Sequence, residues 1–196
     1  MELLSTVPRP EIRRDARRNR DRILDIARAR VAAGDYSLSL NLIAREAGVG
    51  VGTVYRHFPT SQSLLESAAS DAFDDVKDIA EAARKQPDAR RALRLLIGRT
   101  LECMERRPEL TAVLESSDVA CLETLEMMSG FAAAVTDVLS RARQAGLIRR
   151  GITANDLRRL ALGINHARRV PGGEPASRET YLRVLLQGLS TQRSQG

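Results

Sequence analysis

Apolar residues recur along most of this chain at the three- and four-residue spacing of amphipathic helices. Near the N-terminus, Ile23, Ala27 and Val31 form one such stripe, and Gly34 follows it as a glycine typical of helix C-termini. Two shorter patterns come next, the first ended by a glycine and the second by a proline. The sequence therefore predicts three helices joined by tight turns, at residues 20–33, 39–48 and 51–58.

The remaining two thirds of the chain also carry helical patterns. Apolar positions continue without interruption after Pro59, which predicts one long helix from Thr60 to Lys85. Further along, Thr153 and Asp156 have the spacing of a capping box, with Asp in place of the usual Glu. No segment shows the period-two alternation of a strand. The predicted fold is all-α with about nine helices, the later ones over residues 60–85, 90–107, 108–115, 118–146, 153–169 and 176–192.

Charge is distributed unevenly along the chain. Residues 9–30 carry nine Arg and four acidic residues, whereas the formal net charge of the whole chain is +6. Such a segment suits a polyanion, because each neutralised phosphate releases condensed counterions. A solvated helix face with a basic tail would have the same composition. Charge and helix pattern together predict a flexible basic arm at residues 1–14, a helix-turn-helix domain at 15–60 and a C-terminal domain at 61–196.

Composition disfavours several classes of protein. Aromatic residues make up 3% of the chain, which argues against binders that stack sugars or bases. The longest uncharged run has ten residues, whereas a membrane span needs about 20, and no secretory signal is recognisable. The two histidines lie in no metal, phosphate-loop or nucleophile motif, so no enzyme activity, metal or cofactor is expected. Cys103 and Cys121 are interpreted as small hydrophobes of a reduced, cytoplasmic protein.

Three short helices at the basic end of the chain indicate a helix-turn-helix. The second helix of that motif must enter a major groove about 12 Å wide, so its exposed face needs small or polar side chains. In the predicted helix at residues 51–58, Gly52 would let the backbone approach DNA closely. Val51 and Thr53 could contact thymine methyl groups.

The same helix also carries hydrogen-bond donors. Tyr55, Arg56 and His57 can donate to phosphates or base edges. An ordinary buried helical corner, in which Tyr55, His57 and Phe58 simply pack, is the alternative for these residues taken alone.

The segment IAREAGVGVGTVYRHFP, residues 43–59, closely resembles the DNA-binding signature of the TetR family of transcriptional regulators. The resemblance covers about residues 17–70 and includes the helix order, the glycine spacing and the Tyr-x-His-Phe ending. It implies an all-helical homodimer that binds a double-stranded, inverted-repeat operator and has a variable, ligand-binding C-terminal domain. The candidate DNA-binding residues are Arg17, Ser39, Val51, Gly52, Thr53, Tyr55, Arg56, His57, Thr60 and Ser61.

Three departures from the family pattern weaken this expectation slightly. Ser61 stands where a Lys or Arg is usual, so one phosphate-facing cation is missing. Gly50 stands where a capping Ser is common, which costs only a few tenths of a kcal/mol. Asn41 and Leu42 replace a more usual charged pair.

Beyond about residue 80 the interpretation rests on physical pattern. Apolar, flexible side chains between residues 90 and 146 could shape a ligand cavity, although a Met stripe at helical spacing is more often plain core. The helices at 153–169 and 176–192 are expected to form a hairpin that pairs with a second copy, and packing within one chain is the alternative. The candidate ligand-binding residues are Thr100, Leu101, Met104, Met127, Met128, Phe131, Asn165 and His166.

The predicted function is therefore that of a dimeric repressor, which binds a palindromic operator and is released by a small, mostly apolar effector. The alternative is a DNA-binding, chromosome-organising protein on the same fold, which recruits a protein partner and senses no metabolite. A cavity in the C-terminal domain would favour the first function. A sealed core with an exposed hydrophobic groove would favour the second.

Overall fold

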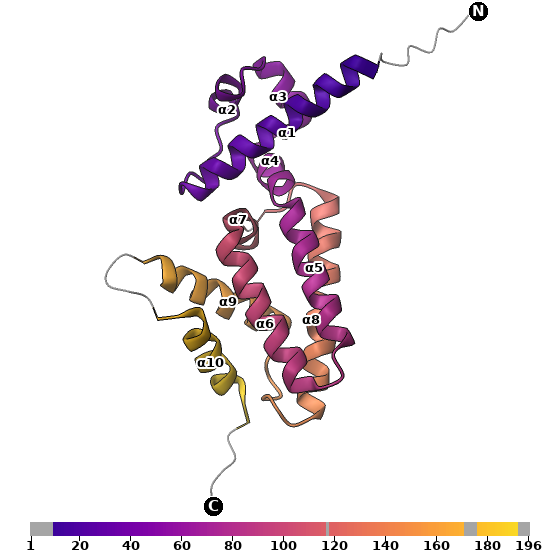
Figure 1. Ribbon diagram of the computed structural model, residues 1–196, viewed down its shortest axis with the longest axis vertical. Coiled ribbons are helices and arrows are strands. Elements are labelled where there is room, and N and C mark those ends of the chain that lie inside the picture. The colour runs from indigo at the N-terminus through magenta and orange to yellow at the C-terminus, as the bar shows by residue number, and fades with distance from the viewer. Residues whose placement is uncertain (1–9, 117, 171–175, 192–196) are drawn as a thin grey trace, which may run out of the picture. The chain divides into compact units, whose positions relative to one another are not determined.

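The computed structural model describes residues 10–116, 118–170 and 176–191, with side chains from residue 14 onward (Figure 1). All regular secondary structure in these residues is helical, which confirms the predicted all-α class. The helices are α1 (Pro10–Ala32), α2 (Leu40–Ala47), α3 (Val51–His57), α4 (Ser61–Ala68), α5 (Ser70–Lys85), α6 (Ala89–Arg106), α7 (Pro108–Glu115), α8 (Leu122–Gln144), α9 (Ala154–Arg169) and α10 (Arg178–Leu189).

The chain divides between Ala68 and Ala69 into two compact units. The first unit holds α1 to α4 and the second holds α5 to α10. Helix α1 begins at Pro10, inside the segment expected to be a flexible arm, and residues 1–9 lie outside the described residues. Helix α4 packs against α1 and so is part of the first unit.

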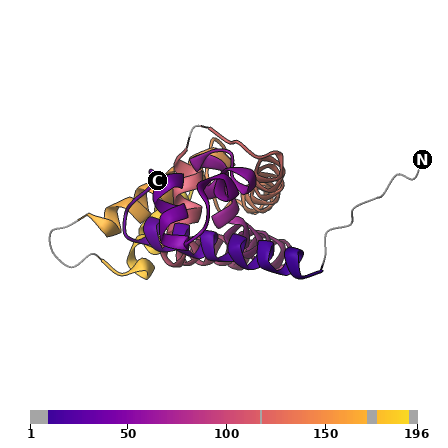
Figure 2. The ribbon, with the colours of Figure 1, turned by 90° about the horizontal axis from the view of Figure 1, so that it is seen from above.

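In the first unit, α2 and α3 lie along one side of the long helix α1 (Figure 1, Figure 2). The predicted stripe of α1 faces them. Ile23 of α1, Ile43 of α2, Val54 of α3 and Leu64 of α4 are all completely buried. Each short helix therefore contributes a large apolar side chain to one shared core.

Two glycines set the turns of this unit. Gly34 after α1 and Gly48 after α2 have φ values of 88° and 64°, in the left-handed region that favours glycine. At the second turn, the Gly48 N–H donates to the Arg45 carbonyl and the Val49 N–H to the Ala44 carbonyl. This pair of bonds is a Schellman motif, which fixes the direction in which the chain leaves α2 and enters α3.

The single helix predicted from Thr60 to Lys85 is wrong, because the structure has two helices there. Helix α4 ends at Ala68, and α5 begins at Ser70. The Nε of Arg28 on α1 donates to the Ala68 carbonyl at 3.0 Å and so supplies a partner for a carbonyl at the end of α4. The break between α4 and α5 contains no Gly or Pro. It coincides instead with a hydrogen bond from a residue 40 positions earlier in the sequence.

In the second unit, α5, α6 and α8 pack against one another, while α9 and α10 each contact α6 (Figure 1). The Glu105 carboxylate of α6 pairs with Arg168 of α9 and Arg178 of α10. Thr153 and Asp156 form the predicted capping box at the start of α9. Residues 171–175, which connect the two helices of the predicted hairpin, lie outside the described residues. None of the described helices is long and apolar enough to cross a bilayer.

Candidate functional site

The outer surface of α3 consists of the residues that the sequence assigned to DNA. Val51 is 43% exposed and Tyr55 is 47% exposed, and Gly52 and Arg56 are exposed beside them. We call these four residues the α3 face. The opposite side of the helix holds the buried Val54. The helix thus presents a surface with a small residue, a hydroxyl and a cation, while its core side anchors it.

Nothing in the described part of the chain requires residue 52 to lack a side chain. A Cβ added there would meet nothing within 4 Å, and the helical backbone at this position does not have a positive φ. The described part of the chain therefore gives no internal reason for a glycine at the start of α3. A close approach by another molecule is a remaining reason for having no side chain there.

Two polar side chains of α3, Arg56 of the α3 face and His57, make contacts within the unit. Arg56 folds back along the helix, with its Nε donating to the Gly52 carbonyl at 3.1 Å and its Nη2 to Thr53 Oγ1 at 3.3 Å. His57 is half-buried, with its ring 6.0 Å from that of Phe58. The guanidinium of Arg20 lies 5.7 Å from the centre of the Phe58 ring. This cation–π contact brings positive charge from α1 to the end of α3.

The hydroxyl-bearing candidates around α3 have different surroundings. Thr60 Oγ1 accepts the Ser63 N–H at 3.0 Å and caps the start of α4. The Ser61 hydroxyl donates to the carbonyl of Leu38 at 3.0 Å, and Leu38 itself has an unusual φ of 44°. Ser39 occupies the N-cap of α2 without a side-chain capping bond. Arg17 is exposed on α1.

A group of three charged residues fixes the turn between α1 and α2. Arg30 on α1 contacts Asp35 in the turn at 2.6 Å and Glu46 on α2 at 2.5 Å. Hydrogen bonds from Ser37, and then from Arg30, hold the pKa of the Asp35 carboxyl below its ordinary value. The hydrogen bond from Arg30 likewise lowers the pKa of Glu46. We call these three residues the Arg30 cluster.

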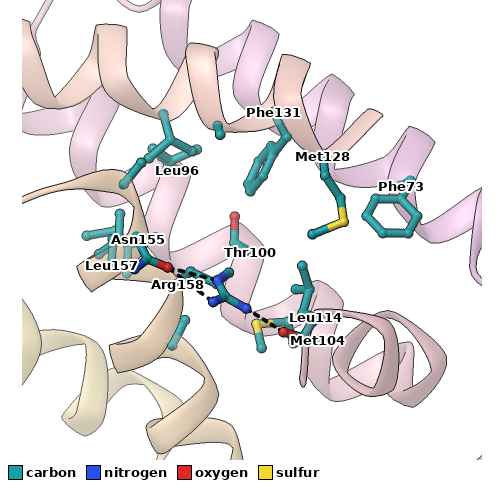
Figure 3. Close-up of a pocket in the computed structure, with 15 residues that line it drawn as sticks. Phe73, Leu96, Thr100, Met104, Leu114, Met128, Phe131, Asn155, Leu157 and Arg158 are labelled. Atoms are coloured by element: carbon teal, nitrogen blue, oxygen red, sulfur yellow. Dashed lines mark hydrogen bonds between the residues drawn. The ribbon is translucent and has the colours of Figure 1, made fainter. Parts of the chain in front are cut away.

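The second unit contains a cavity of about 210 Å³ between α5, α6, α7, α8 and α9. Twelve of its fifteen lining residues are apolar. The exposed residues Ala132 and Asn155 lie on its open side. Figure 3 shows the side chains of Phe131, Met128 and Thr100 turned toward this space.

The cavity includes half of the predicted ligand-binding residues. Thr100, Met104, Met128 and Phe131 line it. Four others lie elsewhere. Leu101 is buried in the core, and Met127 lines a separate pocket of about 310 Å³. Asn165 is buried, and its amide donates to Thr111 Oγ1 at 3.3 Å, whereas His166 is exposed on α9.

Sequence reasoning missed Arg158, which also lines the cavity. Its Nη1 donates to the Leu114 carbonyl at 2.5 Å, and its Nε and Nη2 donate to Asn155 Oδ1 at 3.3 and 3.1 Å (Figure 3). A single Arg on an amphipathic helix is normally a solvated residue, so the sequence offers no signal for this position.

The two cysteines differ in their surroundings. Cys103 is completely buried on α6, and burial raises the pKa of its thiol to about 11. It is therefore protonated and unreactive at neutral pH. Cys121 is half-buried at the N-cap of α8.

Two family models match the chain. Residues 23–68 match the model described as bacterial regulatory proteins of the tetR family. Residues 88–191, more than half of the chain, match the C-terminal domain of SbtR-like transcriptional regulators. The two matches correspond to the helix-turn-helix region and to most of the second unit.

Curated relatives agree with these models. The HTH-type transcriptional repressor KstR of Mycolicibacterium smegmatis is 37% identical over 102 residues, which cover 50% of this chain and 49% of that protein. KstR of Mycobacterium tuberculosis is 35% identical over 102 residues, which cover 50% and 46%. The chain thus matches about half the length of these relatives.

Solved structures share the fold. PfmR, a TetR family regulator from Thermus thermophilus, superposes with a TM-score of 0.63 at 20% identity, over 85% of this chain and 95% of that one. AibR, solved in complex with isovaleryl coenzyme A and operator DNA, gives a TM-score of 0.67 at 16% identity, over 87% and 97%. At such identities the likeness concerns the fold.

Proposed function

The chain belongs to the TetR family of bacterial transcriptional regulators, and from this we propose that it is a dimeric repressor that a small ligand releases from a palindromic operator. The observation that carries the DNA-binding part of the proposal is the α3 face. On the second helix of a helix-turn-helix, this face presents an exposed apolar side chain, a glycine that the described chain does not require, a phenol and a guanidinium. These belong to Val51, Gly52, Tyr55 and Arg56. These groups suit a major groove better than a protein core.

Candidate phosphate contacts surround this face. Tyr55, His57 and Arg17 can reach the backbone of a duplex, and the start of α4 at Ser61 can add a main-chain donor, whereas the Thr60 N–H already donates to Ser63 Oγ at 3.1 Å. Because the Ser61 hydroxyl already donates to the Leu38 carbonyl, its main-chain N–H is the better candidate for a phosphate. Val51, Gly52 and Thr53 are proposed to contact bases.

Binding to DNA is tested with a palindromic duplex selected from a random library. We expect selective binding by two copies of the chain, with an affinity that falls steeply as salt rises. Gly52→Ala is an informative variant, because the added methyl meets no atom of the protein within 4 Å. It should fold normally and bind the duplex more weakly. Equal affinity for random duplexes at ~150 mM salt would sink the claim of sequence specificity.

Helices α9 and α10 are proposed to form the dimer interface. Leu160 on α9 and Val184 on α10 are 41% and 59% exposed, so both present apolar surface to solvent in a single chain. A two-fold axis beside them would give a four-helix interface. Val184→Arg should shift the chain toward monomers in light scattering, whereas Leu122→Arg on α8, at a residue 70% exposed, should not. Equal effects of the two substitutions would remove the support for this interface.

Ligand-controlled release is supported by the cavity of the second unit, which also favours this function over the chromosome-organising alternative. AibR was solved with both isovaleryl coenzyme A and operator DNA, so a protein of this fold holds a ligand and an operator. Coupling of this kind is typically ~1–3 kcal/mol and is reciprocal, so operator must weaken ligand binding by the same factor. Ala132→Trp at the open side of the cavity should block the ligand and leave operator binding unchanged.

A further inference from the structure

Arg158 gives the cavity a positive charge that no acidic side chain among the described residues pairs with. Its three described hydrogen bonds go to a backbone carbonyl and an amide oxygen, both neutral. Within the described parts of the chain, no carboxylate lies within 4 Å of its guanidinium. Asp156, two residues away on the same helix, is held in the capping box with Thr153. By contrast, Arg168 and Arg178 in the same unit both pair with Glu105.

The guanidinium also has unused donors. It carries five N–H groups in a planar fork and stays charged at any physiological pH. Three of them serve Leu114 and Asn155, which leaves two without a partner among the described residues. A planar guanidinium that is fixed by three hydrogen bonds and keeps two N–H groups without a described partner is suited to binding a carboxylate.

A second polar atom of the cavity lacks a partner. Thr100 Oγ1 is completely buried and forms no hydrogen bond within the described residues. Figure 3 shows its hydroxyl among the apolar side chains of the cavity, on a different helix from Arg158. Buried polar groups are nearly always hydrogen-bonded in native proteins, so an unpartnered one that faces a cavity indicates a polar guest.

From these observations, and resting on the ligand-controlled release proposed above, we propose that the cavity binds a small amphipathic monocarboxylate whose carboxylate pairs with Arg158. Its apolar body lies against Phe131, Met128 and Leu96. A cavity of about 150 Å³ with similar lining accepts benzene. A cavity of about 210 Å³ therefore suits a short acyl chain or a single ring rather than a large polycyclic molecule.

The charge of the cavity sets its selectivity. An anion gains a charge-assisted, two-pronged contact with Arg158 in partly apolar surroundings, where such contacts are stronger than in water. A neutral guest of the same length gains only the apolar contacts. A cation would be repelled by Arg158, and the described lining of the cavity contains no acidic residue to attract it.

The proposal is tested with three probes of equal chain length, namely octanoate, 1-octanol and octylammonium. Each is titrated by calorimetry into the full-length protein in the absence of DNA. We expect octanoate to bind at least tenfold more tightly than 1-octanol, and octylammonium to bind most weakly. Equal affinities for octanoate and 1-octanol, or no binding of octanoate at millimolar concentration, would overturn the proposal. This series needs no variant.

Variants then assign the preference to one residue. Arg158→Gln should abolish the advantage of octanoate over 1-octanol while leaving the binding of 1-octanol within about twofold. Arg159→Gln is the matched control, because Arg159 is exposed on the same helix and does not line the cavity. A preference that survives in Arg158→Gln contradicts the assignment. Since Arg158 also joins α9 to the end of α7, Arg158→Lys is the more conservative variant, and it should retain a reduced preference.

A separate measurement distinguishes this inference from the proposed function. Operator release is followed by fluorescence anisotropy of a labelled duplex as each probe is added. If octanoate binds through Arg158 and releases no DNA, the release mechanism fails and the head-group inference stands. If 1-octanol and octanoate release DNA equally well, ligand-controlled release stands and the inference about the head group fails.

Discussion

The candidate sites of the two units are built differently: one is a surface on a single helix, and the other is a cavity between several helices. The α3 face of the first unit lies on the outside of a short helix, and its four residues fall within six consecutive positions. The cavity of the second unit is lined by residues from Phe73 to Ala161, which come from five helices. The order of side chains on a surface of the first kind follows from one helix, although the packing of α1 to α4 holds that helix in place. A site of the second kind exists only after distant helices have packed.

The units also differ in how their interiors are filled. In the first unit, one large apolar side chain from each of α1 to α4 is completely buried in the shared core, and the Arg30 cluster ties the first turn to α2. The second unit has a comparable core but includes a cavity and a buried hydroxyl without a described partner. The first unit is thus built to hold a fixed surface, and the second to leave space for a guest.

The largest expected effect comes from removing a core side chain of the first unit. Ile43 is completely buried on α2, so Ile43→Ala removes apolar contacts and leaves a void. The free energy of unfolding should fall by about 2–5 kcal/mol. Operator binding should be lost together with it, because α3 rests on the same core.

Leu42→Ala on the same helix is the matched control. Leu42 is 42% exposed, so its truncation should change the free energy of unfolding by no more than about 0.5 kcal/mol. Urea denaturation followed by circular dichroism measures both variants. Similar losses for the two would mean that α2 is not packed as described.

The next prediction divides the residues of α3 by role. Thr53→Ala should alter discrimination between base pairs at particular operator positions, by about 1–3 kcal/mol for each lost contact. Tyr55→Phe should weaken binding to all duplexes similarly, because a phosphate contact carries little sequence information. Binding to a panel of single-base operator variants separates the two patterns. Uniform losses from both substitutions would refute the division.

The first unit was largely predictable because its signals are local. Gly34 and Gly48 mark the ends of α1 and α2, and the structure places both in the left-handed conformation that such positions require. Of the α3 residues assigned to DNA, four are exposed (Val51, Gly52, Tyr55 and Arg56) and two are half-buried (Thr53 and His57), whereas Val54, on the other side of the helix, is buried. Each of these features follows from the spacing of residues within a turn or two of helix.

The missed features depend on contacts between distant residues. The break between α4 and α5 is accompanied by a bond from Arg28 to the Ala68 carbonyl, and the intervening sequence gives no sign of it. Arg158 faces the cavity because α9 packs near α7, whereas its sequence context is that of a surface residue. Asn165 was a reasonable ligand candidate by type, but it bonds to Thr111 instead.

A smaller effect is expected from the unpartnered hydroxyl of the second unit. Thr100→Val keeps the shape of the side chain and removes a buried polar group that has no described partner. The free energy of unfolding should rise by about 1 kcal/mol, because the desolvation cost of the hydroxyl disappears. Thr111→Val should have the opposite effect, since Thr111 Oγ1 accepts from Asn165 and donates to the Met104 carbonyl. Denaturation of both variants is the measurement, and a loss of stability in Thr100→Val would contradict the interpretation.

The smallest expected effect concerns the Arg30 cluster, whose residues are partly solvated. Arg30 lowers the pKa of Glu46 and contributes to lowering that of Asp35. A carboxylate whose pKa is depressed by folding stabilises the protein above its unfolded pKa, and this contribution is lost as the pH falls through the folded value. The ordinary values are 3.8 for Asp and 4.5 for Glu. Arg30→Gln should therefore lower the melting temperature at pH 7, and the difference from the native chain should shrink as the pH falls below about 4.

Arg45→Gln on α2 is the matched control for this pH dependence. Arg45 is exposed, and no acidic partner lies within 4 Å of it in the described parts of the chain. Its substitution should leave the pH profile of the melting temperature unchanged.

In Arg30→Gln, the pKa of Asp35 should remain partly lowered, because the bonds from Ser37 to that carboxylate at 2.7 and 3.1 Å remain. A difference between Arg30→Gln and the native chain that stays constant from pH 7 to pH 3 would show that Arg30 acts through packing of its stem rather than through its charge.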